Sequence, residues 1–134
     1  MSARWLLDVN ALVGLLWSVH SLHGKANAWF ARELPLVVGR AFTEPSFIRV
    51  SMADRTIGAN FGEAETALTQ FVATLGPRYG FIERPPPAAI LRGQGVRTHK
   101  DVSDLYLCEL AVANGARLAT LDAGIKHPAA TVIV

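Results

Sequence analysis

Residues 4–10 read Arg4-Trp5-Leu6-Leu7-Asp8-Val9-Asn10, a short apolar run that ends on a carboxylate and is followed by more apolar residues. This pattern predicts a buried strand over residues 5–7, with Asp8 at its carboxyl end and a helix beginning just beyond Asn10. A second run of the same kind, residues 117–122, ends on Asp122. Ligands bind at the carboxyl ends of strands in open parallel sheets. The two aspartates therefore meet at one binding edge if their strands lie close together.

Strand patterns alternate with helix patterns along the whole chain. We expect strands at residues 5–7, 36–38, 81–82, 118–121 and 131–134. The spacing of apolar residues predicts helices over 20–33, from about Thr43 onward, over 62–75 and over 103–114, with one flexible loop at 92–100. Such alternation is typical of an α/β fold with a mainly parallel sheet of about five strands. A length of 134 residues predicts one domain over residues 1–134.

The composition excludes several classes of protein. A hydrophobic fraction of 51% and a mean hydropathy of +0.28 argue against disorder. No apolar run approaches the ~20 residues that a membrane-spanning helix needs, and Asp8 and Asn10 interrupt any N-terminal signal peptide. The single cysteine, Cys108, excludes an internal disulfide and fits a reducing compartment. We therefore expect a cytoplasmic protein without membrane association.

The small net charge is compatible with one acidic site on an otherwise basic surface. The formal charge is +2, but it would be +6 if four of the 11 acidic residues belonged to one metal site. Arginine accounts for 10 of the 13 basic residues, and arginine is well suited to phosphate contacts. A basic surface of this kind fits a polyanionic partner. Base composition of the genome is an equally good explanation for the abundance of arginine.

Four acidic residues are candidates for a shared site: Asp8 and Asp122 at strand ends, and Glu44 and Asp104 near helix starts. Taken singly, an acid at a helix start is explained better by helix capping than by metal binding. Asp8 is different, because an unpaired buried carboxylate costs several kcal/mol and the nearby Arg4 lies at the far end of its strand. A divalent cation is the simpler counter-charge, and carboxylate ligands favour Mg²⁺ or Mn²⁺ over zinc.

Five segments in order give the sequence a family resemblance. They are Leu6-Leu7-Asp8-Val9-Asn10-Ala11-Leu12, then His20…His23…Ala28-Trp29-Phe30, Thr43-Glu44-Pro45-Ser46-Phe47-Ile48-Arg49-Val50, Val102-Ser103-Asp104-Leu105-Tyr106-Leu107 and Leu118-Ala119-Thr120-Leu121-Asp122. In these segments the chain resembles the PIN-domain family, and within it the VapC-like toxins of toxin–antitoxin pairs. The resemblance covers most of the chain.

The resemblance implies a three-layer α/β/α sandwich and an endoribonuclease that uses Mg²⁺ or Mn²⁺. It assigns catalysis and metal binding to Asp8, Glu44, Asp104 and Asp122, with Asn10 and Thr120 as supporting polar residues. Pro45 weakens the assignment of Glu44, and Asp101 is a possible substitute ligand or a cap. The resemblance also implies an RNA substrate that is cut to 5′-phosphate and 3′-hydroxyl ends. It further implies two protein partners, a small cognate antitoxin and a second copy of the chain in a homodimer.

The expected RNA contacts lie in the loop over residues 92–100. Arg92, Arg97, His99 and Lys100 would form a basic rim that holds phosphates, although an ordinary solvated loop explains them equally well. Arg49 is left open between an ion pair within the acidic group and a contact to substrate.

Two other enzyme classes with a strand-end aspartate do not fit. A haloacid-dehalogenase phosphatase needs an acid two residues after its nucleophile, where this chain has Asn10. A receiver domain needs an acidic pair at the end of its first strand, and Asp8 stands between Leu7 and Val9. The remaining alternative is an inactive PIN-like domain that acts as an RNA- or protein-binding module. The presence of four acidic residues argues against it.

Overall fold

The computed structural model describes residues 3–134, without the side chains of residues 40 and 41. Its elements follow one another as β1 (Arg4–Leu7), α1 (Val9–Leu16), α2 (His23–Glu33), β2 (Leu36–Val38), α3 (Arg40–Ala53), α4 (Phe61–Leu75), a 3₁₀ turn η1 (Gly76–Arg78), β3 (Tyr79–Gly80), a 3₁₀ turn η2 (Ala88–Leu91), α5 (His99–Ala113), β4 (Arg117–Thr120) and β5 (Ala130–Val132). None of the described helices is long and apolar enough to cross a membrane.

Within the described residues the strands form one five-stranded sheet in the order β3-β2-β1-β4-β5, and every neighbouring pair is parallel. The first strand of the chain is therefore the central strand. Leu6 pairs with Val38 on one side and with Leu118 on the other. This order places the carboxyl ends of β1 and β4 next to each other.

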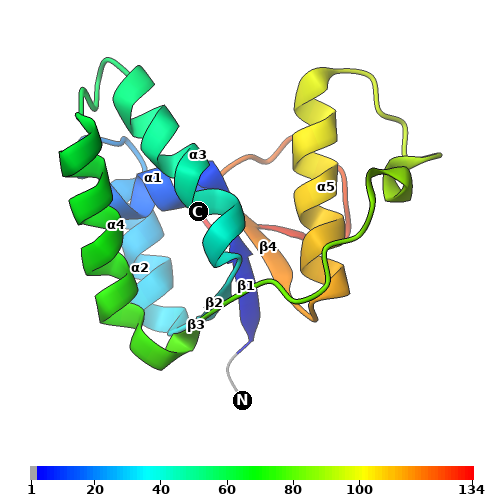
Figure 1. Ribbon diagram of the computed structural model, residues 1–134, viewed down its shortest axis with the longest axis horizontal. Helices are drawn as coiled ribbons and strands as arrows, with labels where there is room; N and C mark the ends of the chain where they lie inside the picture. Colours follow the sequence, from blue (N-terminus) through cyan, green and yellow to red (C-terminus); the bar gives the residue numbers. More distant parts are fainter. Residues whose placement is uncertain (1–2) are drawn as a thin grey trace.

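Helices cover both faces of the sheet (Figure 1). On one face, Trp5 and Leu7 pack into a core that the first four helices share; on the other, Leu6 and Leu118 pack against Cys108 of α5. The alternation along β1 follows from the two-residue repeat of a strand. The predicted α/β/α sandwich is confirmed, and Cys108 is a fully buried core residue.

Helix α3 starts three residues earlier than the predicted start at Thr43. Gly39 lies at its N-cap with φ of +111° and no side-chain cap. This is a left-handed conformation that glycine adopts most readily. A Cβ at Gly39 would overlap Cδ1 of Leu6, so the turn from β2 into α3 depends on glycine. The early start places Pro45 inside the helix instead of in its first turn.

Helix α5 also starts earlier, at His99 instead of Ser103. Thr98 and Asp101 form a capping box there: the Thr98 hydroxyl accepts from the Asp101 N–H, and the Asp101 carboxylate accepts from the Thr98 N–H. Asp101 is therefore a capping residue, and Asp104 lies in the second turn. The third strand differs too, because β3 covers Tyr79–Gly80 whereas residues 81–82 were predicted.

Asn114 fixes the segment that leads from β3 toward α5. Its Oδ1 accepts from the backbone N–H groups of Glu83 (2.9 Å) and Arg84 (3.1 Å). Its Nδ2 donates to the carbonyl of Leu110 (2.9 Å). One nearly buried side chain thus joins the end of α5 to the connecting segment, and it helps hold α5 against the sheet.

Candidate active site

Asp8 ends the central strand and begins the first helix. Its Oδ1 accepts from the backbone N–H of Ala11 at 2.7 Å, which caps α1. The residue is only 7% exposed. Among the described side chains, no lysine, arginine or histidine forms an ion pair with it. Asp8 is therefore a buried carboxylate whose known contacts are hydrogen bonds.

This environment raises the pKa of the Asp8 carboxyl to about 6. Burial is the largest cause, because a low-dielectric surrounding disfavours the charged form. The negative charges of Asp104 and Asp122 act in the same direction, and hydrogen bonds from Thr120 and Ala11 act against them. The site consequently favours any added positive charge next to Asp8.

Asp104 and Asp122 lie beside Asp8 but hold a cation between them. The ammonium Nζ of Lys100 is 2.5 Å from Oδ2 of Asp104 and 2.6 Å from Oδ2 of Asp122. Lys100 and the N–H of Gly124 hold the pKa of Asp122 below its ordinary value. The two carboxylates come from α5 and from the loop after β4, and they converge on one positively charged atom.

Thr120 links the two strand ends. It is fully buried, its hydroxyl donates to the Asp8 carboxylate, and its Oγ1 accepts from the N–H of Asp122 at 3.0 Å. A single hydroxyl therefore orients Asp8 and fixes the turn that carries Asp122. A valine here would have similar volume but would break both hydrogen bonds.

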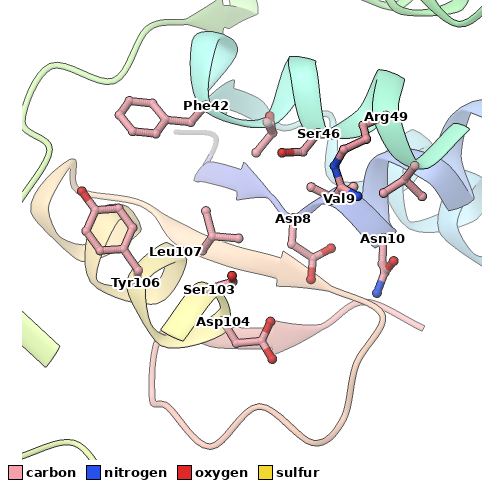
Figure 2. Close-up of a pocket in the computed structure, with 12 residues that line it drawn as sticks. Asp8, Val9, Asn10, Phe42, Ser46, Arg49, Ser103, Asp104, Tyr106 and Leu107 are labelled. Carbon is pink, nitrogen blue, oxygen red and sulfur yellow. The ribbon is translucent and has the colours of Figure 1, made fainter. Parts of the chain in front are cut away.

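Two cavities adjoin at Asp104. The first, about 360 Å³, lies between α3 and α5, where Asp8, Asn10, Ser46, Arg49 and Ser103 also line it. Figure 2 shows the carboxylates of Asp8 and Asp104 pointing into this opening, with Arg49 coming from the opposite helix. The second cavity, about 590 Å³, is lined among others by Gln94, Arg97, Lys100, Asp122 and Lys126. Together they place basic side chains on both sides of the acidic group.

The acidic group fits a divalent cation. Among the described residues, no three His, Cys, Asp or Glu side chains lie close enough to hold a metal ion as they stand. Mg²⁺, however, needs only one or two carboxylates, because it keeps several of its waters. Asp104 and Asp122 both accept hydrogen bonds from the Lys100 ammonium, and Asp8 lines the first cavity together with Asp104. This donor set of carboxylate oxygens suits Mg²⁺ or Mn²⁺.

Comparison with known proteins assigns the chain to a family, although no family model matches it. It is 31% identical over 128 residues to a protein named ribonuclease VapC38 of Mycobacterium tuberculosis, with 90% of this chain and 86% of the relative covered. The chain belongs to the VapC ribonuclease family. Ribonuclease VapC39 of the same species is 29% identical over 96% of both chains, and ribonuclease VapC29 is 29% identical over 91% of this chain and 88% of the relative.

In this VapC-family chain the structure brings together three of the four predicted acids. Asp8, Asp104 and Asp122 surround the adjoining cavities, and Asn10 lines the first of them. Thr120 lies directly beneath, bonded to both strand-end aspartates. The predicted supporting residues thus lie where they can orient the acidic side chains.

Glu44 lies elsewhere, which differs from the prediction. Its Oε2 accepts from the hydroxyl of Tyr79 at 2.9 Å, and it lines a cavity between α3 and α4 with Ile48 and Phe61. Successive residues of a helix are rotated by about 100°, so the face that carries Thr43, Ser46 and Val50 to the acidic group turns Glu44 away from it. The catalytic role that the sequence predicts for Glu44 stays a prediction.

The predicted basic rim divides into two pairs. Arg97 and Lys100 line the second cavity, whereas Arg92 and His99 are exposed outside both cavities. Lys126, Ser46 and Ser103 also line the site but were not among the predicted site residues. Ser46 and Ser103 lie inside the segments that carry the family resemblance. Their position in those segments could have indicated that they line the site.

Proposed function

We propose that this chain is a metal-dependent endoribonuclease that hydrolyses RNA phosphodiester bonds and serves as the toxin of a toxin–antitoxin pair. The observation that carries this proposal is the buried Asp8 carboxylate, which shares a cavity with Asp104, while Asp104 and Asp122 converge on the Lys100 ammonium. Membership of the VapC ribonuclease family supports the reaction class. The proposed site consists of Asp8, Asp104 and Asp122, with Glu44 outside it.

The three aspartates would hold Mg²⁺ or Mn²⁺ at the junction of the two cavities. Bound there, the cation would neutralise the charge of the scissile phosphate and lower the pKa of the attacking water. Asp8 directly follows β1, and Asp104 lies in the second turn of α5. The two hydrogen bonds of Thr120 fix the Asp8 carboxylate relative to the turn that carries Asp122.

Basic side chains on both sides of the acidic group would hold the RNA. Arg49 extends from α3 into the first cavity, and Arg97 and Lys126 line the second. Contacts to phosphate fix the register of a nucleic acid without reading its sequence. A strand lying across both cavities would therefore place one phosphate beside Asp104, with its neighbours on the flanking basic residues.

The proposed reaction is hydrolysis of an RNA phosphodiester bond by water. The oxygen of water forms a bond to phosphorus, and the bond from phosphorus to the 3′-oxygen breaks. The water loses a proton to solvent and the departing 3′-oxygen takes one up, which leaves a 5′-phosphate and a 3′-hydroxyl. Ribose 2′-hydroxyl takes no part in this step.

Incubation with RNA tests the enzyme. We expect the purified chain to cut single-stranded RNA in Mg²⁺, to stop in excess EDTA, and to recover when Mg²⁺ is restored, because the carboxylates alone only add negative charge near the phosphate. End analysis should find 5′-phosphate and 3′-hydroxyl termini. Cleavage that continues after the metal is removed, or 2′,3′-cyclic phosphate termini, would contradict the mechanism.

The proposal includes two protein partners: a small cognate antitoxin and a second copy of the chain. VapC is the name of the relatives, and a ribonuclease toxin requires an inhibitor to be tolerated by its own cell. Val102 and Val112 are 45% and 54% exposed on α5, so this helix retains apolar surface that a second copy of the chain would cover.

Expression in a bacterial host tests the toxin role. The chain expressed alone should arrest growth, and co-expression of the small protein encoded next to it should restore growth. An Asp8→Asn chain produced at the same level serves as the control and should be harmless. Normal growth at a verified high level of the unmodified chain would count against the toxin role.

A further inference from the structure

The ammonium of Lys100 lies between two of the three aspartates, Asp104 and Asp122. Lys100 lies in the first turn of α5, one helical turn before Asp104, and its Nζ bridges Asp104 and Asp122 at 2.5 and 2.6 Å. These hydrogen bonds raise the pKa of the Lys100 ammonium, so it stays charged at neutral pH. The same two carboxylates are proposed metal ligands. A lysine and a metal ion would therefore compete for the same oxygen atoms.

The Lys100 ammonium is held weakly enough for a divalent cation to replace it. Its side chain is 58% exposed, compared with 23% for Asp104 and 29% for Asp122. Exposed ion pairs are weak, since solvent screens them and a long side chain loses freedom in forming them. A divalent cation carries twice the charge in a smaller volume. It can therefore displace an ammonium that is held only at the surface.

Lys100 is not needed to begin its helix. The capping box of Thr98 and Asp101 already satisfies the first N–H groups of α5, and the Asp101 carboxylate also accepts from the N–H of Arg97 at 2.9 Å. The lysine adds nothing to that cap. Its two carboxylate contacts connect α5 to the loop after β4 across the site itself, which indicates a role in the site.

We propose that Lys100 is an exchangeable internal counter-ion, which holds Asp104 and Asp122 together in the metal-free protein and leaves them when a divalent metal binds. This inference rests on the proposed metal-dependent function. The released ammonium stays attached to the rim of the second cavity, next to Arg97 and Lys126, where it can contact an RNA phosphate. Metal binding would thus move a positive charge from the acidic group toward the substrate.

The first test measures Mn²⁺ affinity by electron paramagnetic resonance, without RNA. Lys100→Met removes the charge and keeps most of the chain length, and we expect it to bind Mn²⁺ about 10-fold more tightly than the unmodified protein, because two ion pairs no longer have to break. Lys25→Met on α2 makes the same change of charge at an exposed position and should alter the affinity less than about twofold. Equal or weaker Mn²⁺ binding by Lys100→Met would overturn the proposal.

The second test follows Lys100 in the unmodified protein by NMR. The ¹⁵N-bound protons of its ammonium should give a signal in the metal-free protein, because hydrogen bonds to two carboxylates slow their exchange with water, and saturating Mg²⁺ should remove this signal. A signal unchanged by bound Mg²⁺ would contradict displacement. Tighter Mn²⁺ binding by Lys100→Met, together with no RNA cleavage by the unmodified protein, would support the exchange and refute the nuclease. Absence of metal binding in both proteins would refute both.

Discussion

Replacing Asp8 by asparagine should abolish RNA cleavage and, in the same protein, raise the thermal stability of the metal-free fold. Metal-assisted charge stabilisation contributes several kcal/mol to a transition state, so loss of a ligand should slow cleavage roughly 10³-fold. Stability changes in the opposite direction because Asp8 is a desolvated carboxylate. Asparagine is about as good an N-cap as aspartate, and its Oδ1 can still accept from Ala11. The substitution therefore removes a charge and keeps the helix cap.

The pH dependence gives the stability effect its sign. The pKa of Asp8 rises from 3.8 to about 6 on folding, so the folded protein holds this proton more tightly than the unfolded chain. The associated stability is complete below about pH 4 and is lost as pH rises through 6. At about 1.4 kcal/mol per unit, the Asp8→Asn protein should be more stable by roughly 2–3 kcal/mol above pH 7, or on the order of 10 °C in Tm. The two proteins should be nearly equal at pH 4.

Thermal unfolding in EDTA between pH 4 and 8 measures this difference, and saturating Mg²⁺ should reduce it by stabilising the unmodified protein. Glu44→Gln is the matched control, because it makes the same carboxylate-to-amide change on the other side of α3. We expect the Glu44→Gln protein to cut RNA at a rate within about threefold of that of the unmodified protein. A loss as large as that of Asp8→Asn would place Glu44 in the working site after all. A less stable Asp8→Asn protein at pH 8 would refute the desolvation argument.

Replacing Phe47 by alanine should destabilise the fold by about 3–5 kcal/mol. Phe47 is fully buried and stacks on Trp17, with ring centroids 6.1 Å apart and planes 2° from parallel. The indole of Trp17 also donates to Ser51 Oγ at 2.8 Å, so this contact joins the end of α1 to α3. The lost side chain would leave a cavity between the two helices that begin at the site.

Urea unfolding followed by tryptophan fluorescence measures the change, and Phe42→Ala is the control on the same helix. Phe42 is 42% exposed, so its truncation should cost less than about 1 kcal/mol. Because α3 carries Ser46 and Arg49, the Phe47→Ala protein should also bind RNA less well before it unfolds. A cost as small as that of Phe42→Ala would show that the stacked pair does not anchor α3.

The parts of the structure that depend on local pattern were predictable. The apolar run at residues 5–7 predicts β1, and a carboxylate directly after it predicts a polar group at the edge of the sheet. Asp104 and Asp122 follow the same logic, since each stands next to the end of a strongly apolar element. These features rely on hydrophobic periodicity over a few residues, which the sequence displays directly.

The parts that depend on helix phase or tertiary contact were not predictable. Gly39 begins α3 through a left-handed turn without a side-chain cap, so the sequence offers Thr43 as a more obvious start. Glu44 lies inside α3 on a different face from Thr43 and Ser46. The start of α5 was missed although Thr98 and Asp101 form a recognisable capping box. The position of Lys100 depends on the approach of Asp122 from a distant loop, which no local pattern specifies.

The order of the strands also determines when during synthesis the protein can become active. The central strand β1 is synthesised before its neighbour β4, and helices α1 to α5 lie between them in the chain. Long-range pairing of this kind cannot form until both partners are available. A nascent chain that has not reached residue 122 therefore has Asp8 without Asp122. The acidic group therefore cannot be complete on a nascent chain until β4 has paired with β1.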